Sequence, residues 1–319
     1  MPNPDWIGVD WGTTNLRAWG MCRTGGVLAE ATSNQGMAKL GPEAYEPVLL
    51  DLVGNWLPET GRIPVVVCGM AGAKGAWQMS PYREAPCPPL LASQSVQPLT
   101  VDERLQVSIL PGIRQSRPDV DLMRGEETQV AGYLSMVPDF DGVICLPGTH
   151  SKWVHVSAGE IVSFRTFMTG EIYDLVKRES VLRDLVDENG GDWDPVEFQN
   201  AVETQIARPE LLMARLFSIR AAALVSNLGP GRAAARLSGT LVGAELAGAR
   251  PYWLGRDLIL IGEKRLSNLY AAGLRRLGQT PRFQDSAAMT IAGLAEANRG
   301  FAGDPESARV TGGVGPKAA

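Results

Sequence analysis

Apolar runs that end in glycine-bearing polar turns recur along the chain. In WIGVDWGTTNLR (residues 6–17), a strand-like run of β-branched and aromatic residues ends near Asp10, a polar turn follows Gly12, and a second apolar run begins. DGVICLPGTHSKWVHV (141–156) has the same strand–turn–strand order. DLILIGEKRLSNLYAAGLRRLG (257–278) is typical of a strand, a glycine turn and a helix. Three such units predict an α/β protein with a duplicated architecture.

Helical spacing of apolar positions is found between and after these units. It predicts helices at 41–57, 170–187, 195–206, 209–227, 232–249 and 285–301. A further helix is expected to begin at RGEETQVAGYLSMV, because the two acids in its first turn suit the helix dipole. The proline-rich residues 80–118 predict loops with short strands.

These elements group into two predicted domains. Residues 1–120 form an N-terminal α/β domain that carries the first polar turn. Residues 121–302 form a C-terminal α/β domain that carries the other two turns, and its last helix is expected to pack back on the N-terminal domain. Residues 303–319 contain glycine and proline, so we expect a loose tail.

Composition narrows the classes of partner. Of the 319 residues, 45% are hydrophobic and 20% are charged, as in ordinary globular proteins. The net charge of -5 comes without a basic stripe, so we expect no binding to nucleic acid or to an anionic membrane. No apolar run approaches the roughly 18 residues of a membrane span, and no signal peptide is recognisable. The cysteines are scattered without a CxxC pair, which predicts reduced thiols, no zinc site and a cytoplasmic protein.

Several familiar motifs are absent from the sequence. It has no Gly-Lys dipeptide of a P-loop, no GxGxxG after a strand, no GxSxG elbow and no HExxH zinc helix. Any phosphate chemistry must therefore use other groups. The polar turns offer backbone amides and hydroxyls that suit phosphate oxygens, and Asp10 offers a carboxylate to a metal ion. A simple turn-capping role for Asp10 is the alternative.

Several segments together resemble known kinases. VDWGTTNLR resembles the first phosphate motif of the sugar kinase, Hsp70 and actin superfamily, ICLPGTHSKWV its second phosphate motif, and LILIGEKRLSNLY its adenosine motif. The set CGMAGAKGAW, LPGIRQ, MRGEETQ, LPGTHSKWV and FMTGEIYDLV resembles the 2-dehydro-3-deoxygalactonokinase family. The resemblance implies two duplicated actin-like ATPase (ribonuclease H-like) domains facing across a cleft. It also implies ATP and Mg²⁺, and phosphorylation of the 6-hydroxyl of 2-keto-3-deoxygalactonate in galactonate catabolism.

Two motifs depart from the superfamily pattern. The second phosphate motif usually opens with an aspartate, whereas Cys145, Leu146 and Pro147 occupy that stretch here. The adenosine motif usually carries two or three glycines, whereas here Gly262 is followed by Glu263. The first departure weakens a two-carboxylate metal site, and the second leaves the contacts to the nucleotide base open.

The resemblance implies roles for residues of all three turns. Asp10 anchors the metal ion through water. The residues expected to bind the nucleotide are Gly12, Thr13, Thr14, Asn15, Arg17, Gly148, Thr149, Ser151, Lys152, Gly262 and Glu263. The alternative for Arg17 and Lys152 is a solvated surface charge. His150 lies within the second phosphate turn, so we expect it to donate to phosphate or to be structural rather than to act as a base.

Acidic and glycine-rich segments supply the remaining candidates. Matching RGEET to the catalytic acid of hexokinase-like and exopolyphosphatase-like relatives places Glu127 as the general base, with Glu126 in a supporting role; two solvated acids are the alternative. A sugar acid needs a cation or amide group for its carboxylate and donors for its hydroxyls. The residues expected to supply these are Gln35, Gly36, Lys74, Trp77, Thr169 and Gly170, although their loops are equally well explained as connectors.

Two other functions remain open at this point. A phosphohydrolase of the same superfamily would keep the phosphate turns without needing the sugar-acid loops. A non-catalytic nucleotide or sugar sensor would bind without turnover. A ribokinase-type kinase is disfavoured because its late GAGD-like motif is missing. The expected partners are ATP and a small sugar acid, whose epimer the sequence leaves open, as it leaves open a homodimer.

Overall fold

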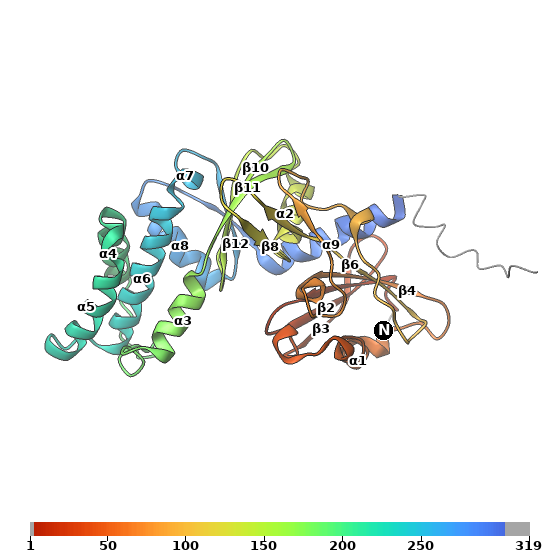
Figure 1. The fold of residues 1–319 in the computed structure, drawn as a ribbon, viewed down its shortest axis with the longest axis horizontal. Helices are drawn as coiled ribbons and strands as arrows, with labels where there is room; N and C mark the ends of the chain where they lie inside the picture. Colours follow the sequence, from red (N-terminus) through yellow and green to blue (C-terminus); the bar gives the residue numbers. More distant parts are fainter. Residues whose placement is uncertain (1–2, 304–319) are drawn as a thin grey trace, which may run out of the picture. The chain divides into compact units, whose positions relative to one another are not determined.

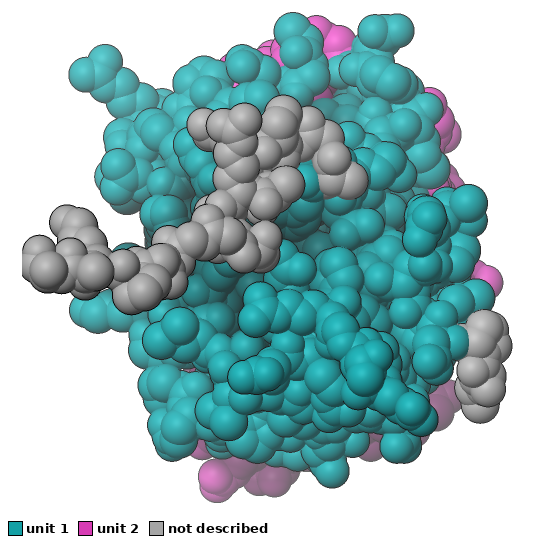
Figure 2. All heavy atoms as spheres, turned by 90° about the vertical axis from the view of Figure 1, so that its right-hand side faces the viewer, with its two compact units in different colours: residues 1–140, 158–161, 287–319 teal, residues 141–157, 162–286 magenta. Residues whose placement is uncertain are grey.

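A computed structural model describes residues 3–303 of the chain (Figure 1). The chain divides into two compact units, coloured in Figure 2. Unit 1 comprises Met1–Phe140, Ala158–Ile161 and Ala287–Ala319, and unit 2 comprises Asp141–Ser157 and Val162–Ser286. The division after Phe140 differs from the expected one at 120/121, because the helix that begins at Glu126 lies in unit 1. The expected loose tail falls, beyond residue 303, outside the described residues.

A five-stranded sheet forms the centre of unit 1. Its strand order is β3-β2-β1-β4-β6, with β1 antiparallel to β2 and parallel to β4, and β4 parallel to β6. The bounds are β1 Trp6–Trp11, β2 Leu16–Met21, β3 Val27–Ser33, β4 Ile63–Gly69 and β6 Leu105–Ile109. Helix α1 (Tyr45–Val53) packs its buried side chains into the same core cluster as the sheet. A smaller sheet has the order β5-β7-β8, with β5 Tyr82–Glu84, β7 Gly112–Gln115 and β8 Asp121–Met123.

Two helices of unit 1 pack closely together at a glycine on each of them. They are α2 (Glu126–Met136) and α9 (Ser286–Gly303). A Cβ atom added at Gly132 would lie 2.0 Å from the Met289 carbonyl oxygen, and one at Gly293 would lie 1.9 Å from that of Thr128. Gln129 Nε2 also donates to Thr290 Oγ1 at 3.1 Å. This close contact holds the start of α2 in place within unit 1.

Unit 2 is built on a second five-stranded sheet with the same topology. Its order is β11-β10-β9-β12-β13, again the third, second, first, fourth and fifth strands in chain order. Strand β9 is antiparallel to β10 and parallel to β12, which is parallel to β13. The bounds are β9 Gly142–Leu146, β10 Ser151–Ser157, β11 Glu160–Phe167, β12 Leu258–Gly262 and β13 Arg282–Asp285. The predicted duplicated α/β architecture is therefore confirmed.

Helices make up the rest of unit 2. They are α3 Thr169–Glu179, α4 Pro195–Ala207, α5 Leu212–Val225, α6 Pro230–Gly248, α7 Arg250–Trp253 and α8 Lys264–Arg276. Helices α4, α5 and α6 lie side by side (Figure 1). Gly239 and Gly243 of α6 allow α4 to approach closely, since a Cβ at Gly239 would lie 2.3 Å from the Phe198 carbonyl oxygen. Within residues 3–303, none of the helices combines the length and apolarity needed to cross a membrane.

Candidate active site

Asp10 is held at the end of β1 by a cation on the neighbouring strand. Arg17 lies directly opposite it in the β1–β2 register, and its Nη2 donates to Asp10 Oδ2 at 2.9 Å. The Asp10 side chain is only 16% exposed. Burial raises the pKa of Asp10, while the charge of Arg17 and its hydrogen bond act in the opposite direction. Arg17 is thus partnered with the candidate metal-anchoring carboxylate and is not an isolated surface charge.

The turn between β1 and β2 rests on a second loop of unit 1. The Gly36 amide donates to the Thr14 carbonyl oxygen at 3.0 Å, and the Met37 amide donates to that of Gly12 at 3.1 Å. A Cβ at Gly36 would lie 2.3 Å from the Thr14 carbonyl carbon, so only glycine fits there. Thr13, Thr14 and Asn15 remain exposed. The turn is therefore supported by the Gln35–Gly36 loop, and its polar groups stay available.

The glycine-rich loop after β4 is anchored by an aromatic side chain. Trp77 stacks on Tyr45 with ring centroids 6.0 Å apart and meets Trp11 edge-on at 6.0 Å. Lys74 of the same loop is exposed. Trp77 is partly buried against the core, so its packing alone explains its presence, whereas Lys74 is left to interact with solvent or a ligand.

The two glutamates at the start of α2 differ sharply in environment. Glu127 is 0% exposed, and its two carboxylate oxygens accept from the Gly125 amide at 2.9 and 2.8 Å. Glu126 is less buried and accepts from the Arg124 amide at 3.0 Å. Burial first, and the charge of Glu126 second, raise the pKa of Glu127 to about 7. A carboxylate with this pKa suits proton transfer near neutral pH.

The fold brings these glutamates close to Asp10. The two segments approach through glycines: a Cβ at Gly125 would lie 3.3 Å from Gly69 Cα, and one at Gly69 would lie 3.5 Å from Asp10 Oδ1. The negative charge of Glu126 contributes to raising the pKa of Asp10. Likewise, the charges of Asp10 and Glu127 both help to raise the pKa of the buried Cys68 thiol. Unit 1 therefore brings together Asp10 at the end of β1 with Glu126 and Glu127 at the start of α2. We call these three residues the acidic cluster.

In unit 2, the turn between β9 and β10 lies against the start of α3. The Glu171 amide donates to the Thr149 carbonyl oxygen at 3.0 Å, and a Cβ at Gly170 would lie 2.5 Å from that of Gly148. His150 Nε2 lies 2.5 Å from Glu171 Oε2, which gives this histidine a local partner. Thr169 and Gly170, predicted from the sequence to contact the sugar acid, lie beside the turn between β9 and β10, and that contact stays a prediction.

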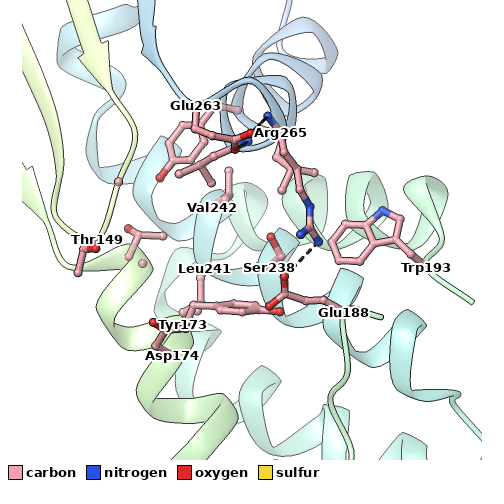
Figure 3. Close-up of a pocket in the computed structure, with 16 residues that line it drawn as sticks. Thr149, Tyr173, Asp174, Glu188, Trp193, Ser238, Leu241, Val242, Glu263 and Arg265 are labelled. Carbon is pink, nitrogen blue, oxygen red and sulfur yellow. Dashed lines mark hydrogen bonds and ion pairs between the residues drawn. The ribbon is translucent and has the colours of Figure 1, made fainter. Parts of the chain in front are cut away.

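A cavity of about 320 Å³ opens beside this turn (Figure 3). It is lined by Gly148, Thr149, Thr169, Gly170, Tyr173, Asp174, Glu188, Trp193, Ser238, Leu241, Val242, Glu263, Arg265, Leu266, Leu269 and Tyr270. Its lining combines apolar side chains with many polar and charged groups, so it can contact both the apolar and the polar parts of a small molecule. Five further lining residues were not predicted from the sequence, and they come from α3, the segment between α3 and α4, α6 and α8: Tyr173, Glu188, Trp193, Ser238 and Arg265. Tyr173 and Arg265 did carry a signal, because they lie within the segments FMTGEIYDLV and LILIGEKRLSNLY that the sequence singled out.

Two charged residues of the cavity have structural partners. Glu263 caps α8, because its carboxylate accepts from the Arg265 amide at 3.0 Å and the Leu266 amide at 3.1 Å. These bonds lower the pKa of Glu263. Arg265 Nη2 lies 3.1 Å from Glu188 Oε2, as the dashed line in Figure 3 marks. Gly262 precedes this cap at the end of β12.

A buried carboxylate supports the floor of the cavity. Glu245 of α6 is 2% exposed and accepts from Trp153 Nε1 at 2.8 Å and from the Tyr270 hydroxyl at 2.6 Å. Thr169 and Ser151 also hydrogen-bond to it. Burial raises the pKa of Glu245, and its four hydrogen bonds oppose that shift. Glu245 therefore connects the second turn with the first residue of α3. Lys152, also buried, has its Nζ 3.4 Å from the His150 carbonyl oxygen.

Comparison with known proteins gives consistent matches over most of the chain. The family model described as 2-keto-3-deoxy-galactonokinase matches residues 10–297. A Rhizobium meliloti protein named "Probable 2-dehydro-3-deoxygalactonokinase DgoK1" is 35% identical over 91% of this chain and 95% of that protein. The 2-dehydro-3-deoxygalactonokinase of Escherichia coli is 32% identical over 86% of this chain and 90% of that protein.

Solved structures agree with these matches. The crystal structure of a "putative 2-dehydro-3-deoxygalactonokinase protein" from Sinorhizobium meliloti has a TM-score of 0.85 at 34% identity, covering 93% of this chain and 99% of that one. An activator of 2-hydroxyisocaproyl-CoA dehydratase from Clostridium difficile, at 12% identity and a TM-score of 0.53 over 98% of this chain and 99% of that one, shares the fold alone. The predicted duplicated α/β fold is confirmed by the repeated sheet topology and by these structural matches. The chain belongs to the 2-keto-3-deoxy-galactonokinase family, a family of sugar kinases.

Proposed function

We propose that the chain transfers the γ-phosphoryl group of ATP to the 6-hydroxyl of 2-keto-3-deoxygalactonate, in galactonate catabolism. The names of its relatives support this substrate. The observation that carries the proposal is the acidic cluster of unit 1, where the buried Glu127, with a pKa of about 7, shares its surroundings with Asp10. A sensor would need no base, so the buried Glu127 disfavours that alternative. A phosphohydrolase could use the same carboxylate to activate water, and the names of the relatives favour the kinase over it.

The nucleotide is assigned to the residues around the polar turns. We place its adenosine part in the cavity of unit 2, whose walls include Leu241, Val242 and Leu266. The exposed hydroxyls and amides of Thr13 and Thr14 offer donors to phosphate oxygens. Gly148 and Thr149 lie in the second turn, and Ser151 and Lys152 begin β10 directly after it. The amino end of α3 at Thr169 and Gly170 favours the negative charge of phosphates. The remaining predicted nucleotide-binding residues set the backbone of the turns. Gly12 and Asn15 do so between β1 and β2, and Gly262 and Glu263 do so between β12 and α8.

Asp10 would hold Mg²⁺. Among residues 3–303, no group of three or more His, Cys, Asp or Glu side chains is arranged to bind a metal ion. Mg²⁺ nevertheless fits the oxygen donors at Asp10, because it often needs only one or two protein carboxylates and keeps its remaining ligands as waters and phosphates. When bound, the ion neutralises charge that develops on the phosphates.

Glu127 acts as the general base. Its carboxylate accepts the proton of the 6-hydroxyl as that oxygen forms a bond to the γ-phosphorus. The bond from the γ-phosphorus to the β,γ-bridging oxygen breaks, and ADP leaves with the electron pair. Gln35, Gly36, Lys74 and Trp77 line or support the loops we assign to the sugar acid in unit 1. Glu126 supports the base through its charge, which raises the pKa of Glu127.

The activity should depend on the ionisation of Glu127. Only the ionised carboxylate accepts a proton, so kcat/KM should rise with pH through a midpoint near 7, the pKa of Glu127. The pH profile of kcat/KM for the sugar acid at saturating ATP measures this midpoint. In Glu127→Gln the residual rate should lose this dependence. An unchanged midpoint in that variant would assign the titration to another group.

Glu245→Gln should weaken nucleotide binding. An amide cannot accept all the hydrogen bonds that the Glu245 carboxylate receives, so the second turn and the start of α3 lose their common support. We expect the KM for ATP to rise roughly tenfold and the KM for the sugar acid to change less than about twofold. Glu46→Gln is the control, because Glu46 of unit 1 is also buried and accepts from backbone amides. Equal changes in both KM values would contradict this role.

A coupled assay of ADP release tests the function itself. The protein is supplied with ATP and Mg²⁺ and with 2-keto-3-deoxygalactonate, its gluconate epimer, or no sugar. Release that requires the galactonate form, with a product phosphorylated at the 6-position, would support the proposal. Sugar-independent release would favour a phosphohydrolase, and absence of release with either acid would favour a sensor.

A further inference from the structure

Arg124 is a buried cation with unused hydrogen-bond donors. It is 8% exposed and its Nη2 donates to the Ser80 carbonyl oxygen at 2.8 Å. Its Nε and Nη1 atoms are buried and have no hydrogen-bond partner within the described part of the chain. Buried hydrogen-bond donors in folded proteins nearly always have an acceptor. Two buried N–H donors without an acceptor on one guanidinium therefore require an explanation.

The surroundings of Arg124 hold its guanidinium under the glycine-rich loop that follows β4. Its Cζ lies 4.2 Å from the centroid of the Tyr82 ring, so the cation packs over the ring face. A Cβ at Gly72 would lie 2.6 Å from Nη1, so the absence of a side chain there leaves space for the cation. The Ser80 hydroxyl, 0% exposed, has no hydrogen-bond partner in the described residues either. Two different side chains thus present unused donors in one place.

The Arg124 guanidinium and the Ser80 hydroxyl belong to the surroundings of the proposed base, but they do not contact its carboxylate directly. The backbone of Arg124 turns toward the glutamates, since its amide donates to Glu126 Oε2. The Glu127 carboxylate folds back on the Gly125 amide. The side chain of Arg124 instead extends to Ser80 and Tyr82. The charge of Arg124 nevertheless acts to lower the pKa of Glu127, so the cation is within electrostatic range of the proposed base.

We propose that Arg124 and the Ser80 hydroxyl bind the carboxylate of the sugar acid and so select acids over neutral sugars. The assignment rests on the proposed function and replaces Lys74 as the group that recognises the carboxylate. A guanidinium offers planar N–H donors that match a carboxylate, which Lys74, on an exposed part of the loop, does not. Removal from water strengthens the attraction between the two charges.

The test compares a sugar acid with a neutral sugar. Activity of the full chain is measured with 2-keto-3-deoxygalactonate and with the analogue in which a hydroxymethyl group replaces the carboxylate. Arg124→Met should lower kcat/KM for the acid roughly 10²-fold and leave that for the analogue within about threefold. Ser80→Ala should lower the acid value roughly fivefold in the same selective way.

Arg83→Met is the matched control. Arg83 is also 8% exposed with a buried Nη1 that has no partner, but it alternates with Tyr82 along β5 and so points to the other face of the strand. Its ratio of acid to analogue activity should equal that of the unmodified protein. If Arg124→Met fails to fold, Ser80→Ala and Arg124→Lys test the proposal instead. The quantity compared is again the ratio of kcat/KM for the acid to kcat/KM for the analogue.

The outcomes separate the inference from the function on which it rests. Equal losses on both substrates in the Arg124 and Ser80 variants would show a structural arginine and overturn the inference. A change of the ratio in Lys74→Met alone would return the carboxylate to Lys74. Failure of the unmodified protein to phosphorylate any sugar acid would instead overturn the proposed function.

Discussion

Asp10→Asn is expected to remove at least about 99% of kcat while the protein stays folded. The amide keeps the shape of the side chain but loses the negative charge that we assign to holding Mg²⁺. The ion pair with Arg17 is also lost; because the Arg17 side chain is 37% exposed, this loss should lower stability by less than about 1 kcal/mol. Turnover with ATP and Mg²⁺ and the thermal midpoint of unfolding are measured on the same preparation.

Asp102→Asn provides the control for the lost ion pair. Asp102 pairs with Arg104 at 2.7 Å and its side chain is 18% exposed, so it matches Asp10 in both respects. It lies outside the acidic cluster, and its variant should keep near-normal kcat. Near-normal kcat in Asp10→Asn would refute the metal-anchoring role. A loss of turnover that follows a large drop in thermal midpoint would favour the alternative, in which Asp10 caps a turn.

Glu127→Gln is expected to lower kcat roughly 10²–10⁴-fold, the usual contribution of a general base. The substitution is isosteric, but an amide does not accept the proton of the 6-hydroxyl. The KM for ATP should change little, because the variant retains both polar turns. Glu126→Gln should cost much less, since Glu126 acts on the reaction only through its charge. Steady-state kinetics of the two variants are compared under identical conditions.

Glu46→Gln controls for the burial of Glu127. Glu46 is 9% exposed and, like Glu127, accepts from backbone amides, in this case those of Val101 and Asp102. Glu46→Gln tests whether replacing a buried carboxylate lowers turnover merely because the protein becomes less stable. If Glu126→Gln loses the rate and Glu127→Gln keeps it, the base is Glu126. If both variants keep the rate, a group other than Glu126 or Glu127 accepts the proton.

The local pattern of the sequence was sufficient for the elements that carry the turns. Strands β1, β9 and β12 are apolar runs that end near glycine, and helix α2 begins at the acids that its dipole favours. The repeated strand–turn–strand pattern at residues 6–17 and 141–156 also predicted the duplication. These features follow from neighbouring residues, which is why the sequence alone revealed them.

The weaker strands were not visible in the sequence. Strand β3 alternates only between exposed and half-buried positions, and β13 has no fully buried residue, so neither has the run of large apolar residues that marks a buried strand. Each is nevertheless the outer strand of a five-stranded sheet. The pairing with a neighbouring strand, rather than side-chain burial, defines them.

The candidate site shows most clearly what the tertiary structure decided. The sequence named Asp10 and Glu127 separately, but only the close approach of Gly69 and Gly125 makes them neighbours. Thr169, predicted to contact the sugar acid, lines the cavity of unit 2, and only the packing of α3 beside the turn between β9 and β10 brings it there. The unused donors of Arg124 depend on contacts far along the chain. Sequence patterns report the surroundings of a residue within a few positions, and distances between remote segments arise only when the chain folds.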